Sequence, residues 1–311
     1  MPRIGLVYHQ DYDLNFGDHV FPTVKYRLIR ESLIAAGFAA DDDFQRPEAA
    51  TDADVALVHT AEWIGKLRRG TLSYEDVLRL EVPYSQAMVR AYWLAAGGTV
   101  LATALALQRG VGLNIGGGFH HAFPGHGEGF CAIHDVAIAV KKALQGGVVS
   151  RAMVIDCDVH HGNGTAAIFH NDPGVYTLSI HQYRNYPHLK PPSSLDIHLE
   201  DGAGDEEYLQ KLEQSCRTAF QAFQPDILFY VAGADPYQED QLGGLNLTME
   251  GLSRRDHLVM DVALTRHIPV VIVLAGGYAA DVADTVRIHC NTARAAEAAL
   301  WQVEWRSLTD G

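Results

Sequence analysis

The stretch 154–164, which reads V-I-D-C-D-V-H-H-G-N-G, is the feature that most restricts how this chain can fold. It continues the apolar run 152–155, which is typical of a buried strand in a parallel sheet. Because strand side chains alternate between faces, Asp156, Asp158 and His160 are expected on one face, and the residues between them on the other. Charged groups that directly continue a buried strand must be paired or bind a metal, so this stretch predicts a polar site at the edge of a sheet.

Short apolar runs alternate with helix-like segments along the rest of the chain. Strands are expected over residues 4–8, 55–59, 111–115, 151–155, 175–180, 227–231 and 270–274. Helices are expected over residues 23–36, 61–69, 85–109 with a loosening at Gly97-Gly98, 133–144, 164–169, 205–223, 250–266 and 281–301. This alternation predicts an α/β fold, a mostly parallel sheet with helices on both faces. No linker or repeat divides residues 1–311, so a single domain is expected.

Five of the expected strands lead directly into residues that can bind or catalyse. Their ends are followed by His120-His121, by Asp158 and His160, by His181, by Asp235, and by Tyr278. In open parallel sheets, ligands bind beyond the carboxyl ends of the strands. These side chains are therefore expected to converge on one site.

Asp158, His160 and Asp235 are the candidate metal ligands of that site. Two carboxylates and one imidazole suit zinc and leave positions for water and a carbonyl oxygen. The alternative for Asp235, which precedes Pro236, is a helix cap or a turn carboxylate. Its place at a strand end beside Gly233 favours the metal role.

The tandem His120-His121, which follows three glycines, is the acid/base candidate. Asp156 and Asn163 are available to orient the second nitrogens of these imidazoles. Tyr278 could donate a hydrogen bond to an oxyanion. A tyrosine after Gly-Gly is otherwise an ordinary turn residue.

Composition excludes several classes of protein. The net charge of −14 argues against a nucleic-acid surface. The chain shows no secretory signal and no run of about 18 apolar residues, so no membrane span is expected. Four dispersed cysteines predict reduced thiols in the cytoplasm. No Gly-x-Ser-x-Gly, Walker-type or Gly-x-Gly-x-x-Gly motif is present.

As an ordered set, the motifs resemble the zinc-dependent histone deacetylases and their bacterial relatives. The residues that carry the resemblance are Gly116-Gly117-Gly118-Phe119-His120-His121-Ala122, Gly129-Phe130-Cys131, Asp156-Cys157-Asp158-Val159-His160-His161-Gly162-Asn163-Gly164, Gly233-Ala234-Asp235 and Gly276-Gly277-Tyr278. The resemblance spans nearly the whole chain. It implies the three-layer arginase/deacetylase-like fold with the active site at the carboxyl ends of the strands.

The resemblance also implies a role for each matching residue. One Zn²⁺ would be bound by Asp158, His160 and Asp235. His121 would be the general base and acid, and Asn163 would orient it. His120 would be its electrostatic partner and would pair with Asp156. Tyr278 would polarise the acyl carbonyl. A structural K⁺ is implied near Asp156, Asp158, His160, Ser179 and Ile180. Substrate contacts are implied for Gly129, Phe130, Tyr186, Leu242, Gly276 and Gly277.

Within the family, the chain looks most similar to the class IV branch. The similar segments are Tyr12, Asn15 and Phe16 in the first loop, the helix around Lys25, and Gly243-Gly244-Leu245. Asn163 stands where class I members carry Asp, and His161 where some class IV members carry Gln. Arginase-type enzymes carry an additional metal-binding Asp where this chain has Gly233, so a single-metal site is favoured.

The expected function is a zinc amidohydrolase that removes acetyl or longer acyl groups from lysine side chains of a protein or peptide. A deacetylase of small acylated amines such as acetylpolyamines is the alternative. Leu242 stands near the expected tunnel mouth where the polyamine branch carries an acidic residue, which counts against a polyamine substrate. Glu239 and Asp240 lie close enough in sequence to keep the polyamine alternative open. A catalytically silent module that binds acylated partners is a third hypothesis.

Overall fold

A computed structural model describes residues 2–14 and 16–303, so Asn15 of the expected class IV likeness lies outside the described residues. The centre of the fold is one eight-stranded sheet with the strand order β2-β1-β3-β8-β7-β4-β5-β6. Every neighbouring pair of these strands is parallel. The strands are β1 (Gly5–Val7), β2 (Phe44–Gln45), β3 (Val111–Asn114), β4 (Ala152–Asp156), β5 (Val175–Gln182), β6 (Leu195–Leu199), β7 (Ile227–Val231) and β8 (Val270–Val273).

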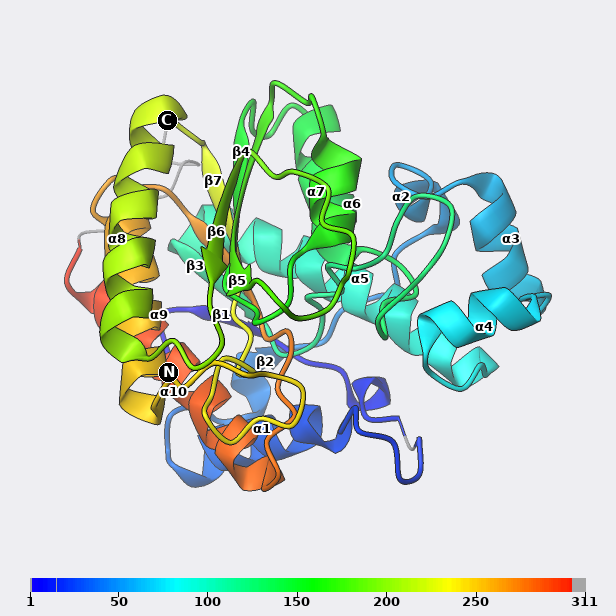
Figure 1. Ribbon diagram of the computed structural model, residues 1–311, viewed down its shortest axis with the longest axis horizontal. Coiled ribbons are helices and arrows are strands. Elements are labelled where there is room, and N and C mark those ends of the chain that lie inside the picture. Colours follow the sequence, from blue (N-terminus) through cyan, green and yellow to red (C-terminus); the bar gives the residue numbers. More distant parts are fainter. Residues whose placement is uncertain (1, 15, 304–311) are drawn as a thin grey trace.

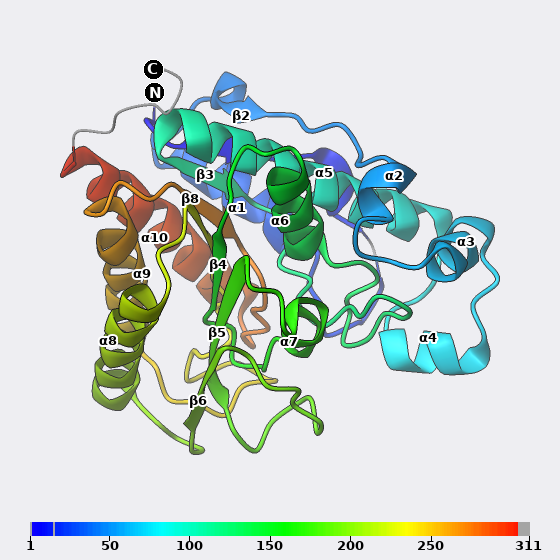
Figure 2. The same ribbon diagram turned by 90° about the horizontal axis from the view of Figure 1, so that it is seen from above.

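Helices cover both faces of this sheet (Figures 1 and 2). One layer contains α1 (Val24–Ala35), α8 (Asp205–Ala222), α9 (Met249–Leu264) and α10 (Val282–Trp301). The other contains α5 (Gln86–Arg109), α6 (Asp135–Gln145) and α7 (Asn163–Phe169). The short helices α2 (Asp52–Val55), α3 (Ala61–Arg69) and α4 (Tyr74–Leu80) lie to one side of the sheet, beyond α5 in Figure 2. The predicted three-layer α/β fold is therefore confirmed.

The strands are apolar on both faces because each face carries its own core. In β7, Leu228 and Tyr230 belong to one buried cluster, and Phe229 and Val231 belong to the other. This two-sided burial explains why the strands read as continuous apolar runs rather than alternating ones. In the central strands, the polar residues Asn114 and Asp156 accordingly stand at the ends of β3 and β4.

The order of the strands brings distant parts of the chain to one edge. Strands β3 and β4 are consecutive in this part of the sequence but are not neighbours in the sheet. The later strands β8 and β7 lie between them. The central strands β3, β8, β7 and β4 therefore end side by side, although the sequence between β3 and β8 is long. A crossover of this kind creates a crevice at the carboxyl ends of the strands, where ligands bind in open α/β sheets.

The segment 55–59 is not the predicted strand. Val55 closes the short helix α2, and Thr51 begins that helix as its N-cap. The Thr51 hydroxyl accepts from the Asp54 amide, and the Asp54 carboxylate accepts from the Thr51 amide. This capping box favours a helix start and outweighs the β propensity of the valines. The prediction also missed α4 and the two edge strands β2 and β6.

Gly97 and Gly98 do not loosen the long helix α5, which runs unbroken through both residues. A side chain on Gly97 would collide with the Glu48 carbonyl oxygen, and one on Gly98 would collide with the Tyr12 hydroxyl. Glycine is therefore required here for close packing of loops against α5. By length and composition alone α5 could also cross a membrane, but 67% of its apolar window is buried inside the protein.

Arg255 in α9 fastens the ends of β4 and β7 to the helix layer. Its guanidinium donates to the Gly233 carbonyl oxygen at 2.6 Å and to the Cys157 carbonyl oxygen at 3.3 Å. It also forms an ion pair with Asp256 at 2.8 Å, and both side chains are buried. Because Cys157 and Gly233 each lie within two residues of a candidate metal ligand, Arg255 fixes the backbone on which those ligands stand.

We predict that Arg255→Met lowers the free energy of unfolding by about 3–5 kcal/mol, because it leaves Asp256 as an unpaired buried charge. The neighbouring Arg254 is a matched control, since its side chain is 50% exposed in its ion pair with Glu206. Arg254→Met should change stability by less than about 0.5 kcal/mol. Urea denaturation measures both. Equal stability of the two variants would show that the buried ion pair does not anchor these strand ends.

Candidate active site

Three predicted metal ligands meet at the carboxyl edge of the sheet. Asp158 and His160 follow β4, and Asp235 follows the neighbouring strand β7. His160 Nδ1 lies 3.0 Å from Asp158 Oδ1 and 3.4 Å from Asp235 Oδ2. All three side chains are buried. The convergence expected from parallel strand ends is therefore present.

This cluster has the properties of a metal site. The Gly276 amide donates to Asp158 Oδ2 and the Val159 amide donates to Asp235 Oδ1, each at 2.9 Å, which fixes both carboxylates. Asp235 Oδ2 has no hydrogen-bond partner among the described residues although it is buried. Burial and the adjacent charge of Asp158 raise the pKa of Asp235 to about 7. A divalent cation would compensate this crowded negative charge, and the Asp-His-Asp set fits zinc.

The glycine-rich turn after β3 aims two histidines at the cluster. Gly117 and Gly118 adopt φ angles of 82° and 84°, which favour glycine. The buried carboxylate of Asp135, the first residue of α6, accepts from the amides of Gly118 at 3.1 Å and Phe119 at 2.8 Å. These two hydrogen bonds fix the turn, and His120 and His121, which follow it, project into the site.

His120 and His121 have different partners. His120 Nδ1 lies 2.7 Å from Asp156 Oδ2, and His121 Nδ1 lies 2.7 Å from Asn163 Oδ1. The ring centroids of the two histidines are 4.0 Å apart. These are the two pairs that the sequence suggested. Because Asn163 Oδ1 can only accept, the ring nitrogen facing it carries the proton, which leaves the lone pair on His121 Nε2.

The two partners give the histidines opposite electrostatic character. Burial disfavours the charged form of His120, but Asp156 and Asp158 raise its pKa to about 9. Burial and the positive charges of His120 and His160 hold the pKa of His121 well below its usual range. His120 is therefore a cation and His121 a neutral imidazole near pH 7. Only a neutral imidazole can accept a proton.

Tyr278 adds a phenol to the lining of the site, and the buried Lys25 lies beside it. Burial, followed by the charges of Asp158 and Asp235, holds the pKa of the Tyr278 phenol well above its usual range, so it stays a hydrogen-bond donor. Its backbone amide donates to Asp240 Oδ2 at 2.6 Å. Lys25 Nζ donates to the Ala275 carbonyl oxygen at 2.7 Å and lies 5.6 Å from the Tyr278 ring centroid. Burial lowers the pKa of Lys25 to about 8.

A cavity of about 160 Å³ leads to this cluster and gathers most of the predicted substrate contacts. It is lined by Glu81, His121, Gly129, Phe130, His160, Asn185, Tyr186, Leu242 and Tyr278. A narrower inner cavity of about 30 Å³ continues past Gly276 to the metal ligands. Gly277, also predicted as a substrate contact, lines neither cavity. A side chain added there would meet Thr285 and Ala234 instead.

The predicted potassium ligands also lie together. Asp156 of β4 and Ser179 of β5 are direct partners in the strand register, and Ile180 follows Ser179. The Asp158 amide donates to Asp156 Oδ1 at 3.1 Å. The Ser179 hydroxyl lies 2.9 Å from His181 Nδ1. Potassium binding by this group stays a prediction.

Sequence reasoning missed the place of Glu128 in the site. Its carboxylate accepts from the amide nitrogen of Asn163 and from the Tyr186 hydroxyl, the latter at 3.3 Å. It therefore lies directly behind the Asn163–His121 pair. The available signal was its position immediately before Gly129 in the Gly-Glu-Gly-Phe-Cys stretch, but spacing alone does not reveal a contact with Asn163.

The parallel sheet, the ligand cluster and the paired histidines define an α/β protein with a candidate hydrolase site. The family model described as the histone deacetylase domain matches residues 19–293, and the chain belongs to this family. Histone deacetylase 2 of Arabidopsis thaliana is 31% identical over 89% of this chain and 75% of that protein. The acetoin utilization protein AcuC of Staphylococcus aureus is 28% identical over 83% of this chain and 72% of that protein.

Two further comparisons agree with this assignment. A protein of Picosynechococcus sp., which has no assigned function, is 39% identical over 94% of this chain and 97% of its own length. The crystal structure of a histone deacetylase homologue from Aquifex aeolicus superposes with a TM-score of 0.81, over 99% of this chain and 91% of that chain. At 23% identity, this similarity supports the fold alone. The resemblance read from the motifs is therefore confirmed at the level of family and fold.

We predict that Gly276→Ala weakens zinc binding at least tenfold, because a methyl group there would overlap the carboxylates of Asp158 and Asp235. Competition with a chromogenic chelator measures the affinity. Gly125→Ala is the control, since no atom of the described residues lies within 4 Å of a side chain added at Gly125. Unchanged zinc affinity in the Gly276 variant would show that these carboxylates are not the ligands.

Proposed function

We propose that this chain is a zinc-dependent amidohydrolase that removes the acyl group from acylated lysine side chains. The observation that carries the proposal is one juxtaposition. The Asp158–His160–Asp235 cluster lies at the inner end of a narrow cavity whose walls include His121 and Tyr278. The family assignment supports a hydrolase that acts on acyl amides.

Each side chain of the cluster has a chemical task in this reaction. A zinc ion held by Asp158, His160 and Asp235 would supply Lewis acidity, which polarises an amide carbonyl and activates water. His121 accepts the proton of the attacking water at Nε2 and returns it to the leaving lysine nitrogen. Asn163 holds His121 in the tautomer that permits this transfer.

Tyr278 stabilises the charge that develops on the carbonyl oxygen. Its phenol is buried beside the cluster and remains protonated because its pKa lies well above the usual range. A donor fixed in a buried site stabilises an oxyanion more strongly than a donor in water does. Tyr278 is anchored through its backbone amide to Asp240, which fixes the approach of the phenol.

The dimensions of the cavity support a slender substrate with a short acyl group. The outer cavity of about 160 Å³ is bounded by the aromatic rings of Phe130 and Tyr186, which suit an aliphatic lysine stem. The inner cavity is only about 30 Å³. We therefore favour the acetyl group over fatty acyl chains.

A small acylated amine is the second candidate substrate. Glu81 lines the outer cavity and Glu128 lies beside its wall, which favours a cationic compound. Leu242 in the same lining offers no charge.

We place the activity in the cytoplasm, because the four cysteines are all buried free thiols, a state typical of reducing compartments.

We predict that Tyr278→Phe lowers kcat by about 10²–10³ and His121→Ala lowers it by about 10²–10⁴, because each removes a group used at the transition state. Steady-state hydrolysis of an acetyl-lysine peptide measures this loss, and thermal unfolding checks the fold. Tyr74→Phe is the control, since that side chain is 79% exposed. Near-normal turnover in both site variants would overturn the assigned roles.

We predict chelator-sensitive hydrolysis of acyl-lysine peptides in the order acetyl over octanoyl over myristoyl, because the inner cavity is small. Acetylputrescine, assayed in parallel, tests the second candidate. Release that increases with acyl length would contradict the short-acyl assignment. Hydrolysis of acetylputrescine but of no peptide would show that the substrates are small acylated amines. Activity that resists chelation would contradict the proposed zinc dependence.

A further inference from the structure

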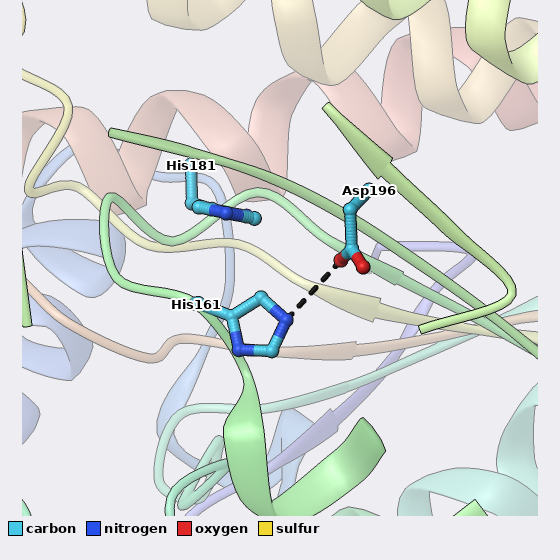
Figure 3. A group of neighbouring side chains, drawn as sticks. All are labelled: His161, His181 and Asp196. Carbon is cyan, nitrogen blue, oxygen red and sulfur yellow. Dashed lines mark hydrogen bonds and ion pairs between the residues drawn. The ribbon is translucent and has the colours of Figure 1, made fainter. Parts of the chain in front are cut away.

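A second cluster of metal-binding side chains lies directly behind the active-site segment. One ligand atom from each of His161, His181 and Asp196 lies within 4.8 Å of the others. Figure 3 shows the three side chains gathered between the segment that follows β4 and the paired strands β5 and β6. We propose that these residues form a second metal site, which takes a divalent transition metal ion such as Zn²⁺.

The register of β5 and β6 builds one side of this site. Ser179 is paired with Asp196, and His181 is paired with His198. Paired residues project to the same face, as do residues two apart in a strand. Asp196 and His181 therefore stand on one face, and His161 approaches that face from the segment after β4, as Figure 3 shows.

The separations between these side chains fit coordination. His161 Nε2 lies 3.1 Å from Asp196 Oδ1. The corresponding separation in the first cluster, from His160 Nδ1 to Asp158 Oδ1, is 3.0 Å. Tetrahedral zinc with bonds of about 2.0–2.1 Å places its ligand atoms about 3.3 Å apart. An ion could thus enter between His161 and Asp196 with little movement of either side chain.

His181 is oriented as a metal ligand. Its Nδ1 lies 2.9 Å from the Ser179 hydroxyl, and its Nε2 lies 2.9 Å from His198 Nδ1. A proton on Nδ1 donated to Ser179 leaves the lone pair on Nε2, which is the usual arrangement behind a ligating imidazole. His198 is exposed, so its ring can turn toward solvent or supply a further nitrogen.

Packing and hydrogen bonding alone are a poor account of these residues. His161 and His181 are both fully buried, with ring centroids 4.6 Å apart. Burying two imidazoles costs free energy unless their nitrogens are hydrogen-bonded or bind an ion. A metal ion bound by the cluster would offset the cost of burying two imidazoles.

Access and donor type define the ion. Asp196 and His198 line an open groove of about 930 Å³, so an ion can arrive from solvent and keep a position open toward it. Two imidazoles and one carboxylate suit zinc or a neighbouring first-row metal, whereas magnesium and calcium require more oxygen ligands. A bound ion would tie the segment carrying His160 and Asn163 to β5 and β6.

The test counts zinc equivalents bound by the metal-free full-length protein in a calorimetric titration. The unmodified protein should bind two equivalents, His161→Gln one, and Asp158→Asn one, because the last two variants each remove one cluster. The double variant should bind none. Gln at position 161 can still donate to Asp196, so the contact is kept while the imidazole is lost.

Two further variants make the count decisive. Asp196→Asn removes the carboxylate and should also lose one equivalent, even if His161→Gln folds poorly. His188→Gln alters a histidine that lines the same groove outside the cluster, and it should keep both equivalents. The proposal is overturned if His161→Gln and Asp196→Asn bind as much zinc as the unmodified protein. Loss of an equivalent in His188→Gln would likewise overturn it, by assigning the binding to the groove.

This outcome is independent of the first cluster. If that cluster held no zinc, the unmodified protein would bind one equivalent, Asp158→Asn would keep it, and His161→Gln would lose it. Failure of the second site and failure of the proposed catalytic site therefore give different patterns of equivalents.

Discussion

Two carboxylates buried side by side at the ends of β4 and β7 are the constraint on which the rest of the structure depends. Asp158 and Asp235 can both remain charged in an apolar interior only beside compensating positive charge, from the imidazoles of His120 and His160 or from a bound metal ion. Backbone amides donate to both oxygens of Asp158 and to Oδ1 of Asp235, whereas Asp235 Oδ2 has no hydrogen-bond partner among the described residues. Arg255 holds the two strand ends from behind but donates to carbonyl oxygens, not to these carboxylates. Asp235 Oδ2 is therefore available to a metal.

Different hydrogen-bond partners separate the roles of two adjacent histidines. His120 and His121 leave one turn together, yet a carboxylate faces the first and an amide faces the second. The carboxylate keeps His120 charged, and that charge helps keep His121 neutral. The two adjacent histidines that follow β4 are also separated, because their side chains point in different directions. His160 turns toward the first cluster and His161 toward the second, so consecutive residues belong to separate clusters.

Much of the fold could be predicted because its signals are local. Apolar runs of strand length between helical segments indicate a parallel sheet whatever the order of the strands. The errors arose where local signals compete or are weak. The capping box at Thr51 favours a helix start over the β propensity of 55–59. The edge strand β6 alternates apolar and polar residues, so it lacks the continuous apolar run by which the other strands were recognised. Gly97 and Gly98 read as helix breakers because the loops packed on them are distant in sequence.

The sequence by itself determined which residues gather at the carboxyl edge, since each chemical group directly follows a strand and parallel strands end together. It thereby indicated Asp158, His160 and Asp235 as one set. Only the tertiary structure decided which groups touch beyond that edge. Glu128 reaches Asn163 and Lys25 reaches the Ala275 carbonyl oxygen across long stretches of chain. Such contacts depend on strand order and loop paths, which follow from the packing of the whole chain and leave no periodic trace in its sequence.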